Sequence, residues 1–297
     1  MKNLPAIQGS GAAIITPFDA SGRIDFDALK RLIDFWAGGG LDVLVILGTT
    51  GESVTLSSFE KQEFVNRVVE LNAGRCSLVL GMGGNNTASL CSELQMSDLS
   101  HFEAILSVTP YYNKPSQEGL FQHYKAVAEA SSKPVILYNV PGRTGINMSA
   151  ETTLRLAHEC SNVCAIKEAS GNIEQIMKII LERPEHFMVL SGDDALTLPI
   201  LAAGGQGVIS VVANAFPAEF TALVHETMHG NLSEARRIHY RLLPFMSLLF
   251  KEGNPAGIKA LLKLMNLCEE NVRLPLTGVS PHLFGELDHA LKMYRQA

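Results

Sequence analysis

The sequence predicts an α/β fold, a (β/α)8 TIM barrel with a C-terminal helical appendage. Eight short, nearly all-apolar runs alternate with longer amphipathic runs, and strands buried on both faces have this composition. No Gly-rich loop follows the first run, whereas an open doubly wound sheet would usually carry one there. The expected strands are Ala13–Ile15, Val43–Leu47, Leu78–Gly81, Ala104–Val108, Val135–Val140, Cys164–Lys167, Met188–Ser191 and Val208–Val211.

Helical periodicity is clearest between the first three runs. Segment Asp27–Trp36 and segment Ser58–Leu71 each place apolar residues on one face. Most prolines fall between elements, and Pro115 is expected to open a helix. Two prolines fall inside expected helices, Pro199 and Pro244, and each predicts a kink or a break.

The chain has 297 residues, more than the roughly 250 typical of such a barrel. Residues 1–230 are expected to form the catalytic barrel and residues 231–297 a C-terminal helical domain. The strand-like runs end before residue 230, and three helical segments follow. These are Asn231–Phe250, Asn254–Met265 and Pro281–Tyr294.

Composition limits the function classes. The net charge of −6 and the lack of a Lys/Arg block give no electrostatic basis for binding nucleic acid. No apolar run approaches the length of a membrane span, and the N-terminus lacks the apolar core of a signal peptide. The five cysteines fit no ligand spacing and are read as free thiols. A cytoplasmic protein without membrane partners is expected.

Lys167 is the strongest candidate for a catalytic residue, because the active groups of such barrels lie at the C-terminal ends of strands. It ends an apolar run, where desolvation should lower the pKa of the ammonium and favour a nucleophilic amine. Such an amine can form an imine with a ketone. The structural alternative is an ion pair with Glu168, although alternation along a strand sends neighbouring side chains to opposite faces. Position alone leaves the two interpretations equally weighted.

Other polar residues follow neighbouring strands, and each has a structural alternative. Tyr138 could move protons beside Lys167, or it could be a core tyrosine with a satisfied hydroxyl. Thr49 and Thr50 lie in a glycine-flanked turn suited to a carboxylate, or they cap the next helix, a role for which Ser57 or Ser58 is the better candidate. Arg143 could clamp a second carboxylate, but surface arginines are more common.

No metal site is expected. Asp193 and Asp194 are adjacent and should point in different directions, and Asp193 resembles the N-cap of the following helix. Segment His225–His229 matches H-E-x-x-H, the zinc-protease pattern. It falls on an outer barrel helix, away from the strand ends, and lacks the further metzincin residues, so a chance match is favoured.

Together these loops resemble the dihydrodipicolinate synthase / N-acetylneuraminate lyase family over nearly the whole chain. The matching segments are Gly48–Glu52, Tyr138–Pro141, Ile166–Gly171, Ser191–Asp194 and Glu252–Pro255. The resemblance implies a class I lyase that binds pyruvate as an imine on a lysine. The Arg143-Thr144-Gly145 turn is typical of the synthase branch, whose second substrate is aspartate semialdehyde, and sialic-acid lyases generally lack it.

The resemblance also implies residue roles. Lys167 forms the imine, and Tyr138 donates and accepts protons through Thr49 and Tyr112, the last reaching a partner subunit's site. Thr50 and the backbone at Ile209 hold pyruvate, Arg143 receives aspartate semialdehyde, and Gly192 belongs to the substrate-binding set. In the implied mechanism the imine becomes an enamine, which attacks the aldehyde before the new amine displaces Lys167. The implied assembly is a dimer of dimers, and no cofactor is involved.

Feedback control is expected to be weak or absent. Regulated relatives bind lysine with a histidine, an asparagine and a glutamate beside a tyrosine pair. Asn85 and Tyr111 fit this pattern, but Ser89 replaces the glutamate, and Ser58 and Lys61 occupy the histidine positions.

Two rival functions remain at this stage. One is a related aldolase acting on a sugar-derived 2-oxo acid, against which Arg143 argues. The other is a barrel that binds a metabolite without turnover, which predicts a broken set of catalytic residues, whereas the set is complete here.

Overall fold

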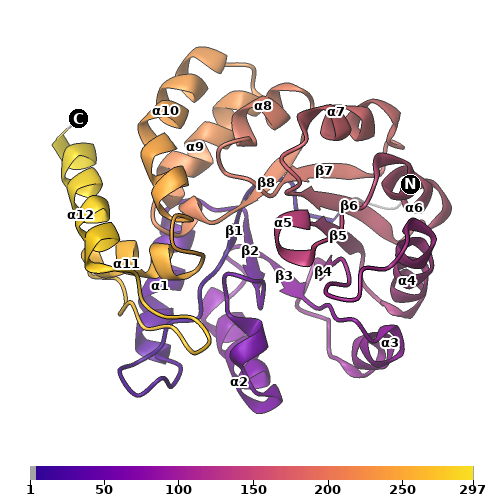
Figure 1. The fold of residues 1–297 in the computed structure, drawn as a ribbon, viewed down its shortest axis with the longest axis horizontal. Helices are drawn as coiled ribbons and strands as arrows, with labels where there is room; N and C mark the ends of the chain where they lie inside the picture. Colours follow the sequence, from indigo (N-terminus) through magenta and orange to yellow (C-terminus); the bar gives the residue numbers. More distant parts are fainter. Residues whose placement is uncertain (1–4, 297) are drawn as a thin grey trace.

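The computed structural model describes residues 5–296, in which eight parallel strands close into a barrel in the order β1 to β8 (Figure 1). Helices surround this barrel and cover the outer face of the sheet, while side chains such as Val45 and Ile136 fill the interior. Both faces of the strands are therefore buried, as the all-apolar runs predict. The strands are β1 Gly9–Ala13, β2 Val43–Ile46, β3 Ser77–Gly81, β4 Ala104–Val108, β5 Val135–Asn139, β6 Val163–Glu168, β7 Met188–Ser191 and β8 Gly207–Ser210.

The helices follow the strands in sequence, and α10 to α12 follow the closed barrel. They are α1 Phe26–Gly38, α2 Ser58–Asn72, α3 Thr87–Met96, α4 Gln117–Ala130, α5 Pro141–Thr144, α6 Ala150–Glu159, α7 Ile173–Glu182, α8 Thr197–Ala202, α9 Pro217–Met228, α10 Leu232–Leu248, α11 Ala256–Leu264 and α12 Pro281–Gln296, with short 3-10 turns η1 Ser53–Thr55 and η2 Val212–Asn214. The first four residues, on which part of the argument against a signal peptide rests, lie outside the described chain.

The predicted position of the first strand was wrong. The strand runs over Gly9–Ala13, four residues before the expected Ala13–Ile15. The strand consists of glycine, serine and alanine, so it lacks the β-branched residues that usually indicate a strand. Packing nevertheless requires these small residues. A Cβ added at Gly11 would lie 2.8 Å from the Val208 carbonyl oxygen, and one at Gly207 would lie 2.6 Å from that of Gly9. At Gly11 and Gly207, the seam between β1 and β8 therefore leaves no room for the β-branched side chains by which strands are recognised.

The expectation for Pro115 was wrong, and at Pro199 and Pro244 a break is excluded, whereas a kink at either proline stays a prediction. Pro115 does not open α4, whose cap is Ser116, its side chain accepting a hydrogen bond from the Gly119 N–H. Pro199 lies in the first turn of α8, where a missing N–H has no intrahelical acceptor to lose, and the helix is not broken. Helix α10 also continues through Pro244, because its buried face packs against α9 and α12.

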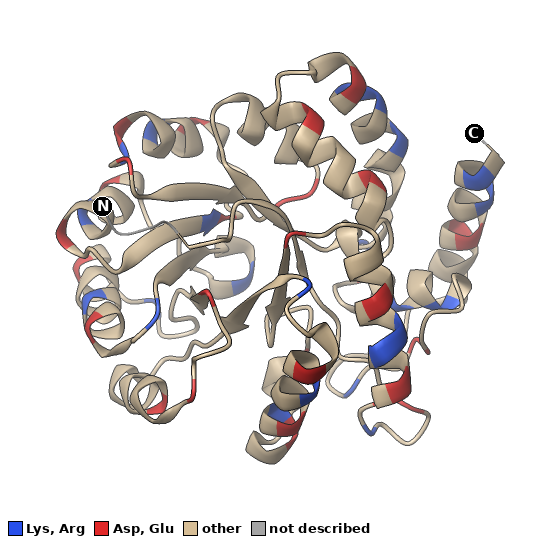
Figure 2. Ribbon diagram, turned by 180° about the vertical axis from the view of Figure 1, so that it is seen from behind, with Lys and Arg blue, Asp and Glu red and all other residues tan. Residues whose placement is uncertain are grey.

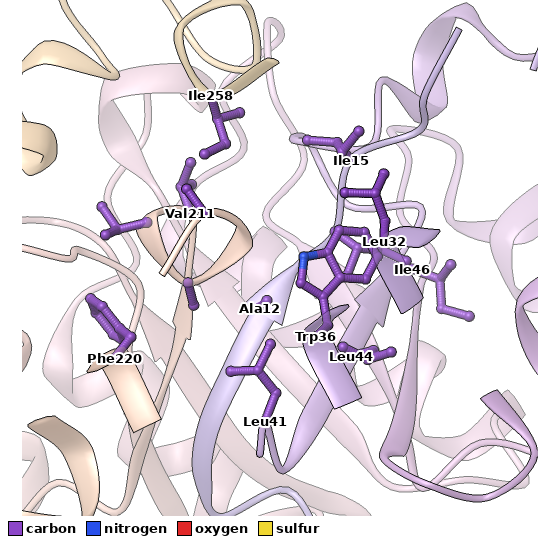
Figure 3. Close-up of a cluster of buried hydrophobic side chains, with 14 of the residues drawn as sticks. Ala12, Ile15, Leu32, Trp36, Leu41, Leu44, Ile46, Val211, Phe220 and Ile258 are labelled. Atoms are coloured by element: carbon purple, nitrogen blue, oxygen red, sulfur yellow. The ribbon is translucent and has the colours of Figure 1, made fainter. Parts of the chain in front are cut away.

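The C-terminal helices share a core with the barrel. Ile258 of α11 belongs to the same buried cluster as Trp36 of α1 and Leu44 of β2 (Figure 3). Trp36 also donates its indole N–H to the Asn214 carbonyl oxygen, 3.0 Å away. Segments 232–248, 256–264 and 281–296 are helical as expected. A domain boundary at residue 230 stays a prediction.

Charged residues of both signs are interspersed along the outer helices rather than gathered on one basic face (Figure 2). Within residues 5–296, no helix combines the length and the apolar composition that a membrane crossing requires.

Candidate active site

The C-terminal ends of the strands open into a cavity of about 1370 Å³. Six of the eight predicted site residues line it: Thr49, Thr50, Tyr138, Arg143, Lys167 and Gly192. The other two, Tyr112 and Ile209, are not part of its wall. Residues from four different strand-to-helix segments therefore meet at one end of the barrel, where such folds carry their chemistry.

Lys167 and Tyr138 form the centre of the site. They are register partners on β6 and β5, and the Lys167 Nζ lies 4.4 Å from the centroid of the Tyr138 ring. The lysine side chain is only 5% exposed and forms no ion pair with any residue of segment 5–296. A buried amine without a carboxylate partner, beside a phenol, is an arrangement suited to imine formation.

The alternative pairing of Lys167 with Glu168 is not found. The Glu168 carboxylate is buried on the other side of β6, where it accepts hydrogen bonds from the Asn139 side chain at 3.1 Å and from the Ser170 N–H at 3.0 Å. Burial raises the pKa of Glu168, and these hydrogen bonds lower it in part. Lys167 and Glu168 are adjacent on β6 and therefore point in opposite directions. Lys167 points into the cavity, and Glu168 points to a hydrogen-bond network outside the barrel.

Gly192 follows β7 and borders the lysine. A Cβ at this position would lie 2.8 Å from the Ala169 Cβ and 3.0 Å from the Lys167 Cε. Glycine therefore leaves the space through which the Lys167 side chain passes into the cavity.

The turn that carries Thr49 and Thr50 is held between two strained residues. Leu47 and Glu52 both have positive φ, 55° and 51°, which is costly for residues with a Cβ. Thr49 is exposed to the cavity, and Thr50 is buried in its wall. The expectation that Ser57 rather than this turn caps α2 is confirmed, because Ser57 and Glu60 form a capping box.

Arg143 lies in the short helix α5, which follows β5, and its exposed side chain lines the cavity mouth. Among the described residues it forms no ion pair, whereas six other arginines do. A guanidinium left unpaired at the rim suits bidentate binding of a carboxylate.

Tyr112 and Ile209 are placed differently from the rest. The Tyr112 side chain is 90% exposed, its backbone has a φ of 68°, and within the described chain its hydroxyl forms no hydrogen bond with Thr49 or Tyr138. Ile209 lies in β8, paired with Gly11, and its side chain is buried in the barrel interior.

Two polar residues of the cavity wall had been given no role from the sequence. Asp194 is buried, and its Oδ2 accepts hydrogen bonds from the Val211 and Val212 N–H groups at 3.1 and 3.0 Å. Burial raises the pKa of Asp194 to about 6. Asn254 belongs to the segment between α10 and α11 and contacts Thr50. The sequence predicted a helical segment from Asn254, but α11 begins at Ala256, and no sequence signal indicates which barrel loop Asn254 contacts.

The expected divergence of the two aspartates is confirmed, but the N-cap prediction was wrong. Asp193 accepts hydrogen bonds from the Ala195 and Leu196 N–H groups, in the turn that precedes α8, whose N-cap is Leu196. The extra turn separates the aspartate from the first helical residue.

The H-E-x-x-H segment lies on α9, and its first histidine contacts the barrel end opposite the cavity. The His225 Nε2 lies 3.1 Å from the Asp42 Oδ2, just before β2 begins. Across residues 5–296, no group of three or more His, Cys, Asp and Glu side chains is arranged to hold a metal ion.

Comparison with known proteins identifies the family of the chain. The model of the family described as "Dihydrodipicolinate synthetase family" matches residues 6–294. A 4-hydroxy-tetrahydrodipicolinate synthase of Flavobacterium psychrophilum is 50% identical over 96% of this chain and 97% of its own length. The crystal structure of a dihydrodipicolinate synthase from Thermotoga maritima superposes with a TM-score of 0.95 at 40% identity, covering 98% of this chain and 100% of that chain.

A further solved structure, described as the first monomeric dihydrodipicolinate synthase variant, has a TM-score of 0.94 at 40% identity and covers 98% of this chain and 97% of that chain. Both the sequence and the fold are thus matched from end to end. The chain belongs to the dihydrodipicolinate synthetase family.

Proposed function

We propose that this chain condenses pyruvate with L-aspartate 4-semialdehyde through a Schiff base on Lys167, as a 4-hydroxy-tetrahydrodipicolinate synthase. The observation that carries the proposal is the buried Lys167 amine, unpaired within residues 5–296 and 4.4 Å from the Tyr138 ring. The identity of about one half to a synthase over nearly the full chain supports the same reaction.

In the first half-reaction the Lys167 amine attacks the ketone carbon of pyruvate, and water leaves to give an imine. Loss of a proton from the methyl carbon gives an enamine. Tyr138 is the group placed to donate and accept these protons, because its ring borders the Lys167 Nζ. Thr49, which lines the same cavity, is proposed to link the Tyr138 hydroxyl to a Tyr112 hydroxyl.

In the second half-reaction the enamine carbon attacks the aldehyde of aspartate semialdehyde. The amine of that substrate then displaces Lys167 and closes the ring, so the enzyme returns to its free amine. Holding both substrates in one cavity supplies much of the rate through positioning. No metal or cofactor is needed in this scheme.

Two carboxylates need partners in this scheme. Thr50 and the backbone at Ile209 are proposed to hold the carboxylate of pyruvate beside Gly192. Arg143 at the rim is proposed to receive the carboxylate of aspartate semialdehyde, since it lines the cavity mouth without an ion pair among the described residues. Within residues 5–296, charged residues of both signs are interspersed along the outer helices (Figure 2), which gives no support to nucleic-acid binding.

The proposed assembly is a dimer of dimers. Tyr112 is 90% exposed in a strained backbone conformation, which suits a side chain that completes its site by contact with a second copy. The free thiols of all five cysteines are compatible with the proposed cytoplasmic location.

An assay with purified protein tests the proposed substrates. Pyruvate with aspartate semialdehyde should give product, and pyruvate with sugar-derived aldehydes should give none. Replacing Arg143 by alanine should raise the KM for aspartate semialdehyde by about 10- to 100-fold, because hydrogen bonds to charged groups are worth about 1.5–3 kcal/mol. Its KM for pyruvate should not change, and neither KM should change in Arg237→Ala on the outer helix α10. Turnover of a sugar-derived aldehyde in preference to aspartate semialdehyde would instead favour another aldolase of the family.

A further inference from the structure

The C-terminal segment places one polar side chain against the substrate-binding turn. Asn254, which is only 7% exposed, donates a hydrogen bond from its Nδ2 to the Thr50 Oγ1 over 2.9 Å. This is the only hydrogen bond of either side chain within residues 5–296, and the buried Asn254 Oδ1 has no partner there. Burying a side-chain amide whose oxygen has no hydrogen-bond partner costs free energy of folding. The presence of such an amide in the cavity wall therefore calls for a function.

The direction of this hydrogen bond determines what Thr50 offers to the cavity. A threonine hydroxyl has one proton to donate and two lone pairs that accept. The amide of Asn254 occupies a lone pair, so the single proton of Thr50 remains available for an acceptor. A carboxylate is such an acceptor, since it has no proton of its own to donate.

We propose that Asn254 is a positioning residue that sets the Thr50 hydroxyl as a hydrogen-bond donor toward the carboxylate of the 2-oxo acid. The inference rests on the proposed function, in which Thr50 holds that carboxylate. It assigns to the segment between α10 and α11 a part in the binding of the first substrate, exerted through Thr50.

The far end of the same turn is fixed to the C-terminal segment as well. The Glu52 Oε1 accepts a hydrogen bond from the Lys259 Nζ at 2.5 Å, and its Oε2 accepts one from the Arg273 N–H at 3.0 Å. Both partners of the Glu52–Lys259 ion pair are fully buried. Burial lowers the pKa of Lys259, and the Glu52 carboxylate raises it in part.

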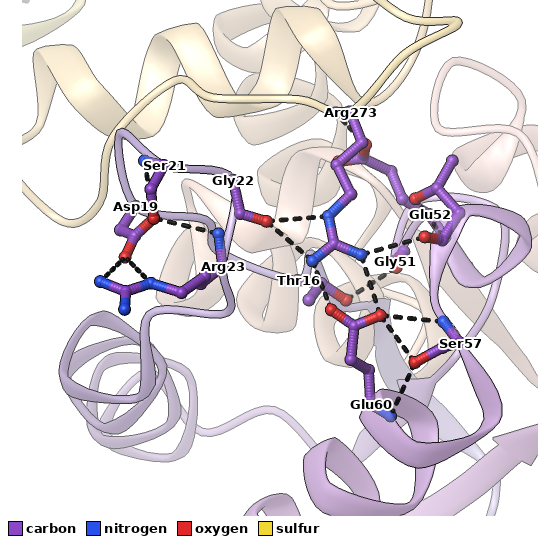
Figure 4. Close-up of polar contacts among 11 residues, drawn as sticks. Thr16, Asp19, Ser21, Gly22, Arg23, Gly51, Glu52, Ser57, Glu60 and Arg273 are labelled. Carbon is purple, nitrogen blue, oxygen red and sulfur yellow. Dashed lines mark hydrogen bonds and ion pairs between the residues drawn. The ribbon is translucent and has the colours of Figure 1, made fainter.

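Arg273 extends this anchor across the loops of the barrel. Its guanidinium donates to the Gly22 and Thr55 carbonyl oxygens and pairs with Glu60 at the start of α2 (Figure 4). The strained turn therefore has a contact with the C-terminal segment at Thr50 and another at Glu52, which fixes its backbone and leaves the hydroxyl direction to Asn254.

Borohydride trapping of the pyruvate imine at increasing pyruvate concentration tests the proposal without the second substrate. Asn254→Ala should raise the half-saturating pyruvate concentration about fivefold, the effect of one ordinary hydrogen bond. Asn254→Asp keeps the shape but supplies an acceptor, so Thr50 donates to it and the new charge faces the substrate carboxylate. This variant should raise the half-saturating concentration by at least about 50-fold.

The methyl ester of pyruvate supplies the decisive comparison, because it lacks the carboxylate. The loss in Asn254→Asp should be confined to pyruvate and should be small for the ester. The matched control is Asn72→Asp. Asn72 is a buried asparagine at the other end of the barrel that hydrogen-bonds the backbone of Cys76. This variant should leave the half-saturating concentrations of pyruvate and of its methyl ester unchanged. Equal losses for both ligands, or normal pyruvate binding by a folded Asn254→Asp protein, would overturn the proposal.

A second comparison keeps the test informative if Asn254→Asp does not fold. In a Thr50→Val background, Asn254→Ala should have no further effect on half-saturation, and a full additional fivefold effect would contradict the coupling. Absence of trapping in the unaltered protein would refute the proposed function itself, whereas trapping with insensitive Asn254 variants would refute only this inference.

Discussion

Lys167 and Tyr138 are paired across β6 and β5, and their side chains enter the same cavity with the amine 4.4 Å from the ring centroid. The register of two parallel strands, rather than a flexible loop, sets this geometry. Residues held on strands keep their mutual positions more closely than residues on loops. The pair is therefore organised before any substrate arrives.

Replacing Tyr138 by phenylalanine keeps the ring beside Lys167 and removes the hydroxyl. We expect kcat to fall by about 100- to 10,000-fold, the range typical of a lost general acid–base group, with little change in thermal stability. Steady-state kinetics measure this. The matched control is Tyr124→Phe, which removes a buried hydroxyl that donates to the Ser107 carbonyl oxygen and should leave kcat near normal. Equal activity of Tyr138→Phe and the parent would exclude the proton-transfer role.

Gly192→Ala should displace the reactive lysine. The added Cβ would lie 3.0 Å from the Lys167 Cε and Cγ and 2.8 Å from the Ala169 Cβ, so the side chain must shift. A displacement of about 1 Å costs on the order of 100-fold in rate. The control is Gly278→Ala, where an added Cβ meets nothing within 4 Å. Unchanged kcat in Gly192→Ala would show that the lysine does not need this space.

Asp194 should make the free energy of unfolding depend on pH. Burial raises its pKa to about 6 from an ordinary value of 3.8, so the folded state binds the proton more tightly than the unfolded chain. The stabilisation that protonated Asp194 gives to the folded state is fully present below about pH 4 and is lost as the pH rises through 6. The side chain of the Asp194→Asn variant cannot ionise, so the variant does not lose this stabilisation. The free energy of unfolding of the variant minus that of the parent should therefore rise from pH 4 to pH 7. Urea unfolding across this range measures the difference, and a constant difference would contradict the assignment.

Inhibition by lysine should be weak or absent. Ser58 and Lys61 line the same cavity as Tyr111, and Ser89 of α3 stands where regulated relatives carry the glutamate. A bound lysine would therefore meet the like charge of Lys61 and lack that glutamate as a partner for its ammonium. Activity measured against rising lysine checks this, and strong inhibition at sub-millimolar concentrations would refute it. Ser89→Glu should gain sensitivity, whereas Ser92→Glu on the same helix should not.

The order of the elements could be predicted from the sequence because strands buried on both faces leave all-apolar runs. The first strand could not, since close packing of β1 against β8 leaves room only for residues such as Gly11 and Gly207. Propensity and packing conflict there, and packing determines the outcome.

Some residues of the candidate site could likewise be located from the sequence, and others could not. Lys167, Tyr138 and Arg143 could be located because each follows or ends a recognisable strand. Asn254 and the Lys259–Glu52 ion pair could not, because they join residues more than 200 positions apart. No local pattern encodes which barrel loop a distant helix will contact.

The proposed reaction requires that Lys167 carries the imine. The most direct measurement is borohydride reduction in the presence of pyruvate, followed by peptide mass mapping. We expect a stable, pyruvate-dependent adduct on the peptide containing Lys167 and none in Lys167→Arg. An adduct on another lysine, or no adduct while the enzyme turns over, would contradict it.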